Sequence, residues 1–228
     1  MPSTSANLDI LFEDNHLIIV NKKVGDIVQG DRTGDTPLSE LVKEYIKKKY
    51  NKPGKVFLGV VHRLDRPTSG AIIFARTSKA LERLNAMLRK REIHKTYWAL
   101  VQNKPTEVSA TLEHYLKKNA KNNKSTWYTN EVPTSKKAIL HYKILKELNR
   151  YYLLEIDLET GRHHQIRAQL SAIGSPIKGD LKYGFNRSNK DGGIHLHARQ
   201  LQFTHPVSKE HLTIQAAVPD DPLWKECI

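Results

Sequence analysis

Residues 62–70 read HRLDRPTSG and place one carboxylate, Asp65, between Arg63 and Arg66. Positive neighbours favour the ionised form of a carboxylate. An arginine keeps its proton in proteins, so it can neutralise an anion but cannot act as a base. The stretch therefore predicts an ionised Asp65 in a cationic site that suits an anionic substrate. The alternative is a solvated surface ion pair, since most such pairs contribute little to stability.

Two apolar segments, residues 56–61 and 71–75, flank this stretch. Short apolar runs of this kind are typical of buried strands. A loop between two buried strands rests on a rigid scaffold, and catalytic side chains often lie on such loops. The flanking segments therefore favour a functional Asp65 over a merely solvated one.

The composition bounds the size and the partner of the protein. The 228 residues suffice for one domain, residues 1–228, in which two lobes are possible. Lys and Arg number 37 against 24 Asp and Glu, so the formal charge is +13. Solubility alone would be served by a smaller charge of either sign. The excess predicts a polyanionic partner, and nucleic acid is the expected one.

The single cysteine, Cys227, excludes an internal disulfide framework and a cysteine-rich zinc site. The first ten residues lack the basic start and apolar core of a signal peptide. No apolar run approaches the roughly 20 residues that cross a bilayer. We therefore expect a cytoplasmic protein with no membrane partner. The sequence has no long apolar surface stripe, so we expect no obligate protein partner either.

Apolar periodicity predicts two helices. Thr36 is the expected N-cap of the first, with Pro37 at its first position, an apolar stripe over 38–46 and residues 47–49 in its last turn. The second helix is expected over residues 78–90. Strand-like runs are more numerous and often follow one another directly; they lie within 8–22 and at 96–101, 139–145, 151–158, 195–203 and 212–218. This order predicts an α+β fold with a largely antiparallel sheet.

Residues 117–124, KKNAKNNK, form a basic segment without periodicity. We interpret it as a mobile loop that follows a phosphate backbone, with a solvated hairpin tip as the alternative.

A second polar segment covers residues 160–184. Apolar residues at helical spacing begin at Ile166, and Gly174 is the expected end of that helix. The free N–H groups of a helix start attract anions. Either a substrate phosphate or the Asp65 carboxylate would suit this start, whose first turn is expected to contain Arg162, His163, His164, Gln165 and Arg167.

The histidine pairs His163-His164 and His195/His197 raise the question of a metal site. A third and a fourth ligand at a recognisable spacing are missing, so structural or RNA-contacting histidines are the favoured interpretation. The sequence also lacks a P-loop, GxGxxG, HExxH and GxSxG. We therefore expect neither a metal nor a cofactor.

Together, HRLDRPTSG and GRHHQIRAQ (residues 161–169) closely resemble motifs of the RluA-type family of RNA pseudouridine synthases. EDNHLIIVNKKVG from Glu13 resembles the family's opening motif, and KTYWALV from Lys95 resembles its tyrosine-bearing strand. GSPIKGDLKYG and HLHARQLQFTHP resemble its C-terminal half. The resemblance implies the pseudouridine synthase catalytic fold: a mixed, largely antiparallel central sheet flanked by helices and loops, with a central catalytic cleft.

The resemblance also implies an activity. Such enzymes isomerise uridine in structured RNA, ribosomal or transfer RNA, to pseudouridine without a cofactor. By resemblance Asp65 is the essential carboxylate, Arg167 its salt-bridge partner, and Tyr97 the aromatic residue that packs on the target uracil. Whether Asp65 acts as a nucleophile or as a base stays open.

Chemistry on a stacked base requires that the base be flipped out. Arg63 matches the residue that relatives insert into the vacated space, while Thr68 and Ser69 would support the catalytic loop next to the substrate. Other substrate contacts are expected from the second motif, at Arg162, His164 and Gln165.

This chain departs from the family pattern at three positions: His163 stands where threonine is common, Gln169 where histidine is common, and Lys23 where proline is usual. We also expect no separate N-terminal RNA-binding domain, because the opening motif begins so early. Two alternatives are an inactive RNA-binding or folding factor with the same fold, and another RNA-modifying enzyme such as a methyltransferase.

Overall fold

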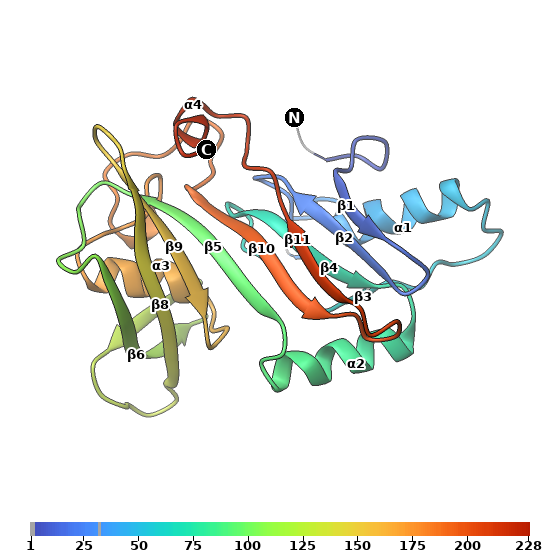
Figure 1. The fold of residues 1–228 in the computed structure, drawn as a ribbon, viewed down its shortest axis with the longest axis horizontal. Coiled ribbons are helices and arrows are strands. Elements are labelled where there is room, and N and C mark those ends of the chain that lie inside the picture. The colour runs from blue at the N-terminus through green and yellow to red at the C-terminus, as the bar shows by residue number, and fades with distance from the viewer. Residues whose placement is uncertain (1–2, 32) are drawn as a thin grey trace. The chain divides into compact units, whose positions relative to one another are not determined.

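The computed structural model describes residues 3–31 and 33–228. The chain has the predicted α+β class and divides into two compact units (Figure 1). Unit 1 comprises Met1–Lys95 and Ala198–Pro219, and unit 2 comprises Thr96–His197 and Asp220–Ile228. Whether residues 1–228 form one domain stays a prediction. No helix in the described ranges is long and apolar enough to cross a membrane.

Unit 1 is built on an antiparallel sheet in which β2 and β4 are central. All of Leu17–Val20 and of Ala71–Ala75 is at most 1% exposed, so these strands are buried on both faces and read as continuous apolar runs. Helix α2 packs on one face through Ala80 and Leu84. The elements of unit 1 are β1 Ile10–Glu13, β2 Leu17–Lys22, α1 Leu38–Lys49, β3 Gly59–Val60, β4 Ser69–Ala75, α2 Ser78–Arg89, most of β10 Leu196–Thr204, and β11 His211–Gln215.

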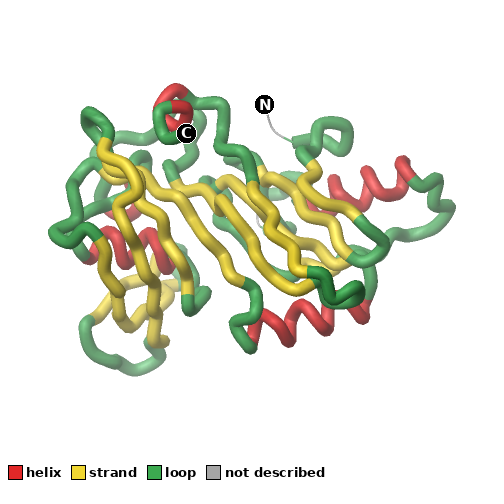
Figure 2. Tube along the Cα trace, in the orientation of Figure 1, coloured by secondary structure: helices red, strands yellow, loops and turns green. Residues whose placement is uncertain are grey.

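Unit 2 contains an antiparallel sheet with the strand order β5-β9-β8-β6-β7 (Figure 2). The β8–β9 hairpin and the β6–β7 hairpin are joined by the pairing of β8 with β6. Helix α3 lies against β6 and β7, where Leu116, Ala138, Ala168 and Tyr183 form a small core. The elements are most of β5 His94–Val101, β6 Ser109–Asn119, β7 Lys124–Tyr128, β8 Lys136–Glu147, β9 Tyr152–Leu158, α3 Gln165–Ala172, the 3₁₀ turn η1 Leu181–Tyr183, and α4 Pro222–Lys225.

The carboxyl-terminal helix α4 is docked within unit 2. Asp221 caps its start by accepting from the N–H groups of Leu223 and Trp224, and the Trp224 ring stacks on His195 at 5.2 Å. The Cys227 thiol donates to the Leu223 carbonyl at 3.2 Å. Burial raises the pKa of this thiol to about 11.

Most predicted elements are confirmed, and four details are corrected. Pro37, not Thr36, occupies the N-cap position of α1, and no side chain caps it. The first flanking strand, expected over 56–61, shrinks to β3. Residues 117–124 are not an unpaired loop but the end of the β6–β7 hairpin, which was the alternative interpretation, with Lys118 opposite Ser125 and a turn at 120–123. Helix α3 begins at Gln165, so Arg162 and His163 precede it and do not share its face.

Candidate functional site

Asp65 lies in a tight turn that leads into β4. The Thr68 N–H donates to the Asp65 carbonyl at 3.0 Å, which closes the turn over Arg66 and Pro67. Leu64 is buried beneath the turn, whereas Arg63 is exposed and Asp65 is half-buried. The turn therefore holds the carboxylate at the surface of unit 1 and leaves Arg63 in solvent, where the expected contact with RNA requires it.

The buried lysine Lys22 anchors this turn from below. It is 1% exposed, and its Nζ donates to the carbonyls of Lys23 at 2.9 Å, Arg66 at 3.2 Å and Thr68 at 2.7 Å. The Gly25 N–H donates to the same Arg66 carbonyl at 3.0 Å. Lys22, at the end of β2, and Gly25 thus fix the backbone that follows Asp65.

The charge of Asp65 acts on Lys22. Burial lowers the pKa of Lys22 to about 8, and the carboxylates of Asp26 and Asp65 act against this shift. The Asp65 carboxylate is therefore close enough to favour the charged form of Lys22. Lys22 was not predicted as a site residue, and its only signal in the sequence is a lysine at the end of a strand that begins with four apolar residues.

His62 fixes the start of the same segment. The Ile73 N–H of β4 donates to His62 Nε2 at 3.2 Å, so this nitrogen is an acceptor and the neutral ring has its proton on Nδ1. Burial, and secondly the charge of Lys95, lower the pKa of His62 to about 3. His62 is thus a neutral tether and not a proton donor near neutral pH.

The end of the motif is packed, not exposed. Thr68 and Ser69 are each 2% exposed, which fits support of the loop; their contact with substrate stays a prediction. Gly70 has φ +116°, and a Cβ there would lie 2.4 Å from the Ala198 carbonyl oxygen. Only glycine allows β4 to approach β10 so closely.

Arg66, which had no role in the sequence analysis, forms an ion pair with Asp35 at 2.5 Å. Both side chains are about half exposed, so the pair contributes little stability. This exposed pair gives no reason to assign Arg66 a catalytic role.

The GRHHQIR motif surrounds the start of α3 in unit 2. His164 is the N-cap residue with φ +54°, and its side chain makes no cap bond. The Gln165 side chain stabilises the turn instead: Oε1 accepts from Thr160 Oγ1 at 2.7 Å and from the Arg162 N–H at 3.0 Å, and Nε2 donates to the Ile139 carbonyl at 3.0 Å. Gln165 therefore shapes the turn, and Arg162 stays at the surface, where its Nε donates to the Lys137 carbonyl.

Arg167 is buried and forms a bidentate pair with Asp180. Its Nε donates to Oδ2 at 2.7 Å and its Nη2 to Oδ1 at 2.9 Å. A guanidinium has five N–H donors, so this pair does not exhaust its capacity. The predicted salt bridge to Asp65, a residue of unit 1, stays a prediction.

His164 and Tyr97 are both largely buried. Burial and then the charge of Arg167 lower the pKa of His164 to about 2, and its Nδ1 lies 3.0 Å from Tyr183 Oη. A neutral, hydrogen-bonded ring suits a structural role. Tyr97 lies on β5 opposite Ile156 and is 7% exposed. Its contact with uracil stays a prediction.

The residues suspected as metal ligands have other partners. His195 Nδ1 lies 2.9 Å from Asn189 Nδ2, and its Nε2 lies 3.2 Å from Asp221 Oδ1. His197 packs on Trp224 at 5.9 Å. In residues 3–31 and 33–228, no group of three His, Cys, Asp or Glu side chains is arranged to hold a metal ion.

Comparisons with known proteins place the chain in a family. A family profile described as RNA pseudouridylate synthase matches residues 16–172. "Ribosomal large subunit pseudouridine synthase D" of Xylella fastidiosa is 33% identical, over 94% of this chain and 67% of its own length. "tRNA pseudouridine synthase C" of Pectobacterium carotovorum is 32% identical, over 92% of this chain but only 58% of its own length.

Two further comparisons agree. "Uncharacterized RNA pseudouridine synthase YhcT" of Bacillus subtilis is 34% identical over 94% of this chain and 70% of its own length. The solved structure of "Human RNA Pseudouridylate Synthase Domain Containing 4" has a TM-score of 0.78 at 24% identity, over 93% of this chain and 89% of that one, and so supports the fold. The chain spans between 58% and 70% of the length of the three curated relatives. The chain therefore belongs to the RluA-type family of RNA pseudouridine synthases, which are isomerases.

Proposed function

We propose that this chain isomerises uridine in structured RNA to pseudouridine, with Asp65 as the reacting carboxylate. The observation that carries the proposal is the Asp65 turn, held by Lys22 and His62 inside the region that the family profile matches. The names of the relatives favour ribosomal or transfer RNA as the substrate. The formal charge of +13 suits either one.

The reaction is an isomerisation with a closed balance. The C–N bond between uracil and sugar breaks, and a C–C bond between the sugar and a uracil ring carbon forms. The proton on that carbon is lost, and the ring nitrogen gains one. The proposed reaction therefore needs no oxidant, reductant or cofactor, and Asp65 supports it as either a nucleophile or a base.

The remaining roles follow from position and chemistry. Exposed Arg63 would occupy the space that the flipped uridine leaves, since a flat guanidinium stacks on bases and binds phosphate. Tyr97 would pack on the uracil ring, and Arg167 would add a second cation for the Asp65 carboxylate. We place the reaction in the cytoplasm, because a chain with one cysteine suits a reducing compartment.

Asp65→Asn tests the proposal. It keeps the size of the side chain but removes the negative charge, so we expect pseudouridine formation to fall by about 10³-fold or more while RNA affinity stays within threefold. The control is Asp35→Asn, which removes another carboxylate from unit 1 at the exposed pair with Arg66.

The measurement is pseudouridine mapping on ribosomal and transfer RNA after incubation with each purified variant. Retained turnover in Asp65→Asn would contradict the role of Asp65. A wild-type protein that binds these RNAs but forms no pseudouridine on them would favour the inactive RNA-binding factor.

A further inference from the structure

The hairpin of β6 and β7 concentrates positive charge at its end. Lys118 lies opposite Ser125 and Asn119 opposite Lys124, so residues 120–123 form the tip. We call residues 117–124 the basic hairpin. It contains four lysines, at 117, 118, 121 and 124, and no acidic residue occurs between positions 114 and 130.

Lys182 of η1 adds a fifth cation at the same place. Its Nζ donates to the carbonyls of Asn122 at 3.3 Å and Asn123 at 3.1 Å, which holds the ammonium against the tip. Lys118 and Lys121 are exposed. Within the described residues, neither they nor Lys117 form an ion pair with a carboxylate. The hairpin therefore presents cations whose charge remains available to an external anion.

The base of the hairpin is fixed to the GRHHQIR segment by a polar network. The Ser125 N–H donates to Tyr183 Oη at 2.8 Å, and Ser125 Oγ donates to the His163 carbonyl at 2.7 Å. The His163 ring spans two residues of the hairpin: Nδ1 lies 2.9 Å from Ser125 Oγ and Nε2 lies 3.1 Å from Asn123 Oδ1. His163 also stacks on His164 at 3.8 Å. A threonine side chain at this position would be too short to reach Asn123.

The network ends at Arg167. The Tyr183 ring has the Arg167 guanidinium at 5.1 Å and the Lys124 ammonium at 5.1 Å, both within cation–π range. Tyr183 thus joins the hairpin to the arginine that the proposed function places next to the substrate. All of these residues belong to unit 2, so the arrangement does not depend on unit 1.

We propose that the basic hairpin binds the phosphate backbone of the substrate RNA beside the target uridine, and that His163 is the positioning residue that holds it there. The proposal rests on the proposed function and assigns a contact surface to it. Phosphate contacts set the register and orientation of a protein on nucleic acid, and a hairpin fixed relative to Arg167 would do this for the target base. Lysine side chains bind phosphate groups independently of the base sequence, so the surface that the hairpin contacts is the RNA backbone.

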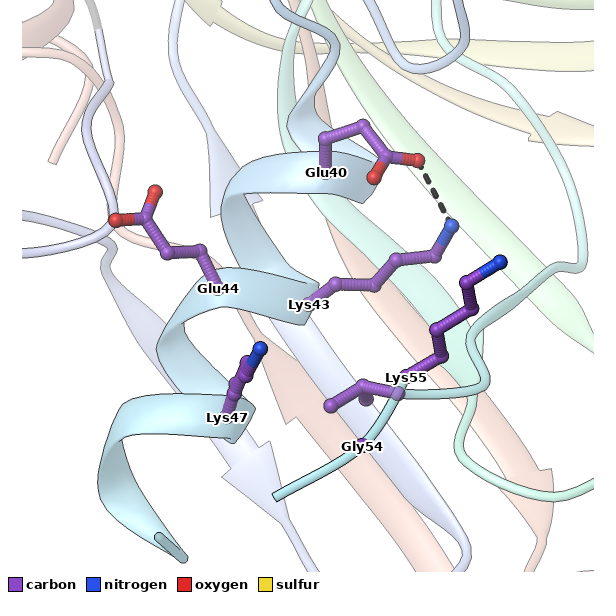
Figure 3. Close-up of a pocket in the computed structure, with 7 residues that line it drawn as sticks. Glu40, Lys43, Glu44, Lys47, Gly54 and Lys55 are labelled. Atoms are coloured by element: carbon purple, nitrogen blue, oxygen red, sulfur yellow. Dashed lines mark hydrogen bonds and ion pairs between the residues drawn. The ribbon is translucent and has the colours of Figure 1, made fainter. Parts of the chain in front are cut away.

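A second lysine-rich surface provides the comparison. A groove of about 420 Å³ lies beside α1, lined by Lys43, Lys47 and Lys55 together with Glu40 and Glu44 (Figure 3). Glu40 pairs with Lys43 at 2.8 Å. Because acids and lysines alternate along this groove, its charge is partly compensated, and it serves as a control surface and not as the proposed site.

The test compares two triple variants that each remove three positive charges. Lys117→Ala/Lys118→Ala/Lys121→Ala leaves the Ser125, His163 and Tyr183 contacts intact. Lys47→Ala/Lys52→Ala/Lys55→Ala is the matched control on the α1 side, where Lys52 is an exposed residue between α1 and Lys55. The probe is an in vitro transcribed transfer RNA, which carries no modification, and binding is measured by fluorescence anisotropy from 50 to 300 mM KCl.

We expect the hairpin variant to bind about tenfold more weakly or worse, and its slope of log K against log salt to shrink by about 2 to 3. The control is expected to change affinity less than threefold. In turnover assays the hairpin variant should raise KM about tenfold and change kcat less than threefold. Equal losses in both variants, or no loss in the hairpin variant, would overturn the proposal.

The role of His163 is tested separately, because its ring bonds to Ser125 and Asn123 of the hairpin and these are not among the substituted lysines. His163→Thr should raise KM at least threefold with little effect on kcat, and amide hydrogen exchange of residues 117–124 should become faster. His163→Gln, whose amide offers a donor and an acceptor on a longer chain, should restore part of the KM. Unchanged exchange and KM in His163→Thr would remove the positioning role.

The outcomes separate this inference from the proposed function. The binding assay does not require turnover. A wild-type chain that forms no pseudouridine would therefore contradict the proposed function, but the binding test of the hairpin would remain valid. Normal turnover by the hairpin variant at low RNA concentration would sink the inference alone.

Discussion

Lys22 shows how one buried charge shapes the Asp65 turn. It loses hydration on burial, which lowers its pKa to about 8, but it gains three carbonyl acceptors and two nearby carboxylates. Two of these carbonyls, of Arg66 and Thr68, are 44 and 46 residues away in sequence. Lysines are almost never fully buried unless they are paired, so a lysine at the end of a strand is expected to be exposed. Only the position of the Asp65 turn beside Lys22 explains its burial.

Lys22→Met tests this anchor. The thioether fills similar space but removes the ammonium donor from three carbonyls, of which that of Arg66 keeps the Gly25 N–H and that of Thr68 is buried, so we expect the free energy of unfolding to fall by about 1–3 kcal/mol. Turnover should fall more than RNA affinity, because the turn around Asp65 loosens while the exposed basic surface is unchanged. Urea unfolding followed by circular dichroism gives the stability. Lys23→Met is the control, and equal effects of the two substitutions would contradict the anchor.

At the scale of elements, the approach of β4 to β10 depends on Gly70. Gly70→Ala adds a Cβ 2.4 Å from the Ala198 carbonyl oxygen at φ +116°, where two backbones meet and neither can yield cheaply. We expect a loss of about 2–4 kcal/mol in the free energy of unfolding. Urea titration checks this, with Gly30→Ala as the control, since a Cβ at Gly30 meets nothing within 4 Å. A wild-type midpoint for Gly70→Ala would refute the close approach.

Elements with a strong local signal were predictable from the sequence. Helix α2 has its N-cap at Thr77, whose Oγ1 accepts from the Ala80 N–H at 3.1 Å, and its apolar spacing is regular. Gly174 ends α3 as predicted: the Ser175 N–H donates to the Leu170 carbonyl, a Schellman-type stop. These signals lie within one turn of the helix end that they define.

Elements fixed by distant contacts were not predictable. The start of α3 depends on His164 in the left-handed region and on the Gln165 amide, which bonds to Ile139 in another strand. The basic hairpin has a polar, lysine-rich sequence, and only the pairing of β6 with β7 shows that its two ends are strand. Local composition therefore indicated a loop, which holds for the turn at 120–123 but not for the paired residues on either side.

The same reasoning applies to the site. HRLDRPTSG identifies Asp65 from sequence alone, because the chemistry of the motif is local. Its supports are not local: Lys22 lies on β2 and the His62 tether ends on β4. Likewise, Asp180 as the partner of Arg167 follows from packing within unit 2 and from no spacing in the motif.

At the scale of the whole molecule, each unit contains a histidine that is held neutral. The pKa of His62 in unit 1 is lowered to about 3 and that of His164 in unit 2 to about 2, against about 6.5 in an unfolded chain. Below pH 6 the unfolded state therefore binds more protons than the folded state. We expect each histidine to lower the free energy of unfolding by about 1.4 kcal/mol per pH unit as the pH falls from 6 to 4.

The two units can be followed separately in this acid titration. All three tryptophans, Trp98, Trp127 and Trp224, lie in unit 2, so their fluorescence reports on that unit, while circular dichroism reports on both. His164→Gln should flatten the fluorescence-detected slope, and the exposed His94→Gln should leave it unchanged. An identical slope in all three proteins would show that other groups dominate acid unfolding.

The docked helix α4 has a consequence for chemical labelling. Only a thiolate reacts readily with alkylating reagents, and Cys227, which follows the end of α4, is kept protonated by burial. It is also the one cysteine of the sequence. The rate at which Cys227 is alkylated therefore measures how often the carboxyl-terminal residues detach from unit 2. A dye attached to Cys227 would label a single position in the chain.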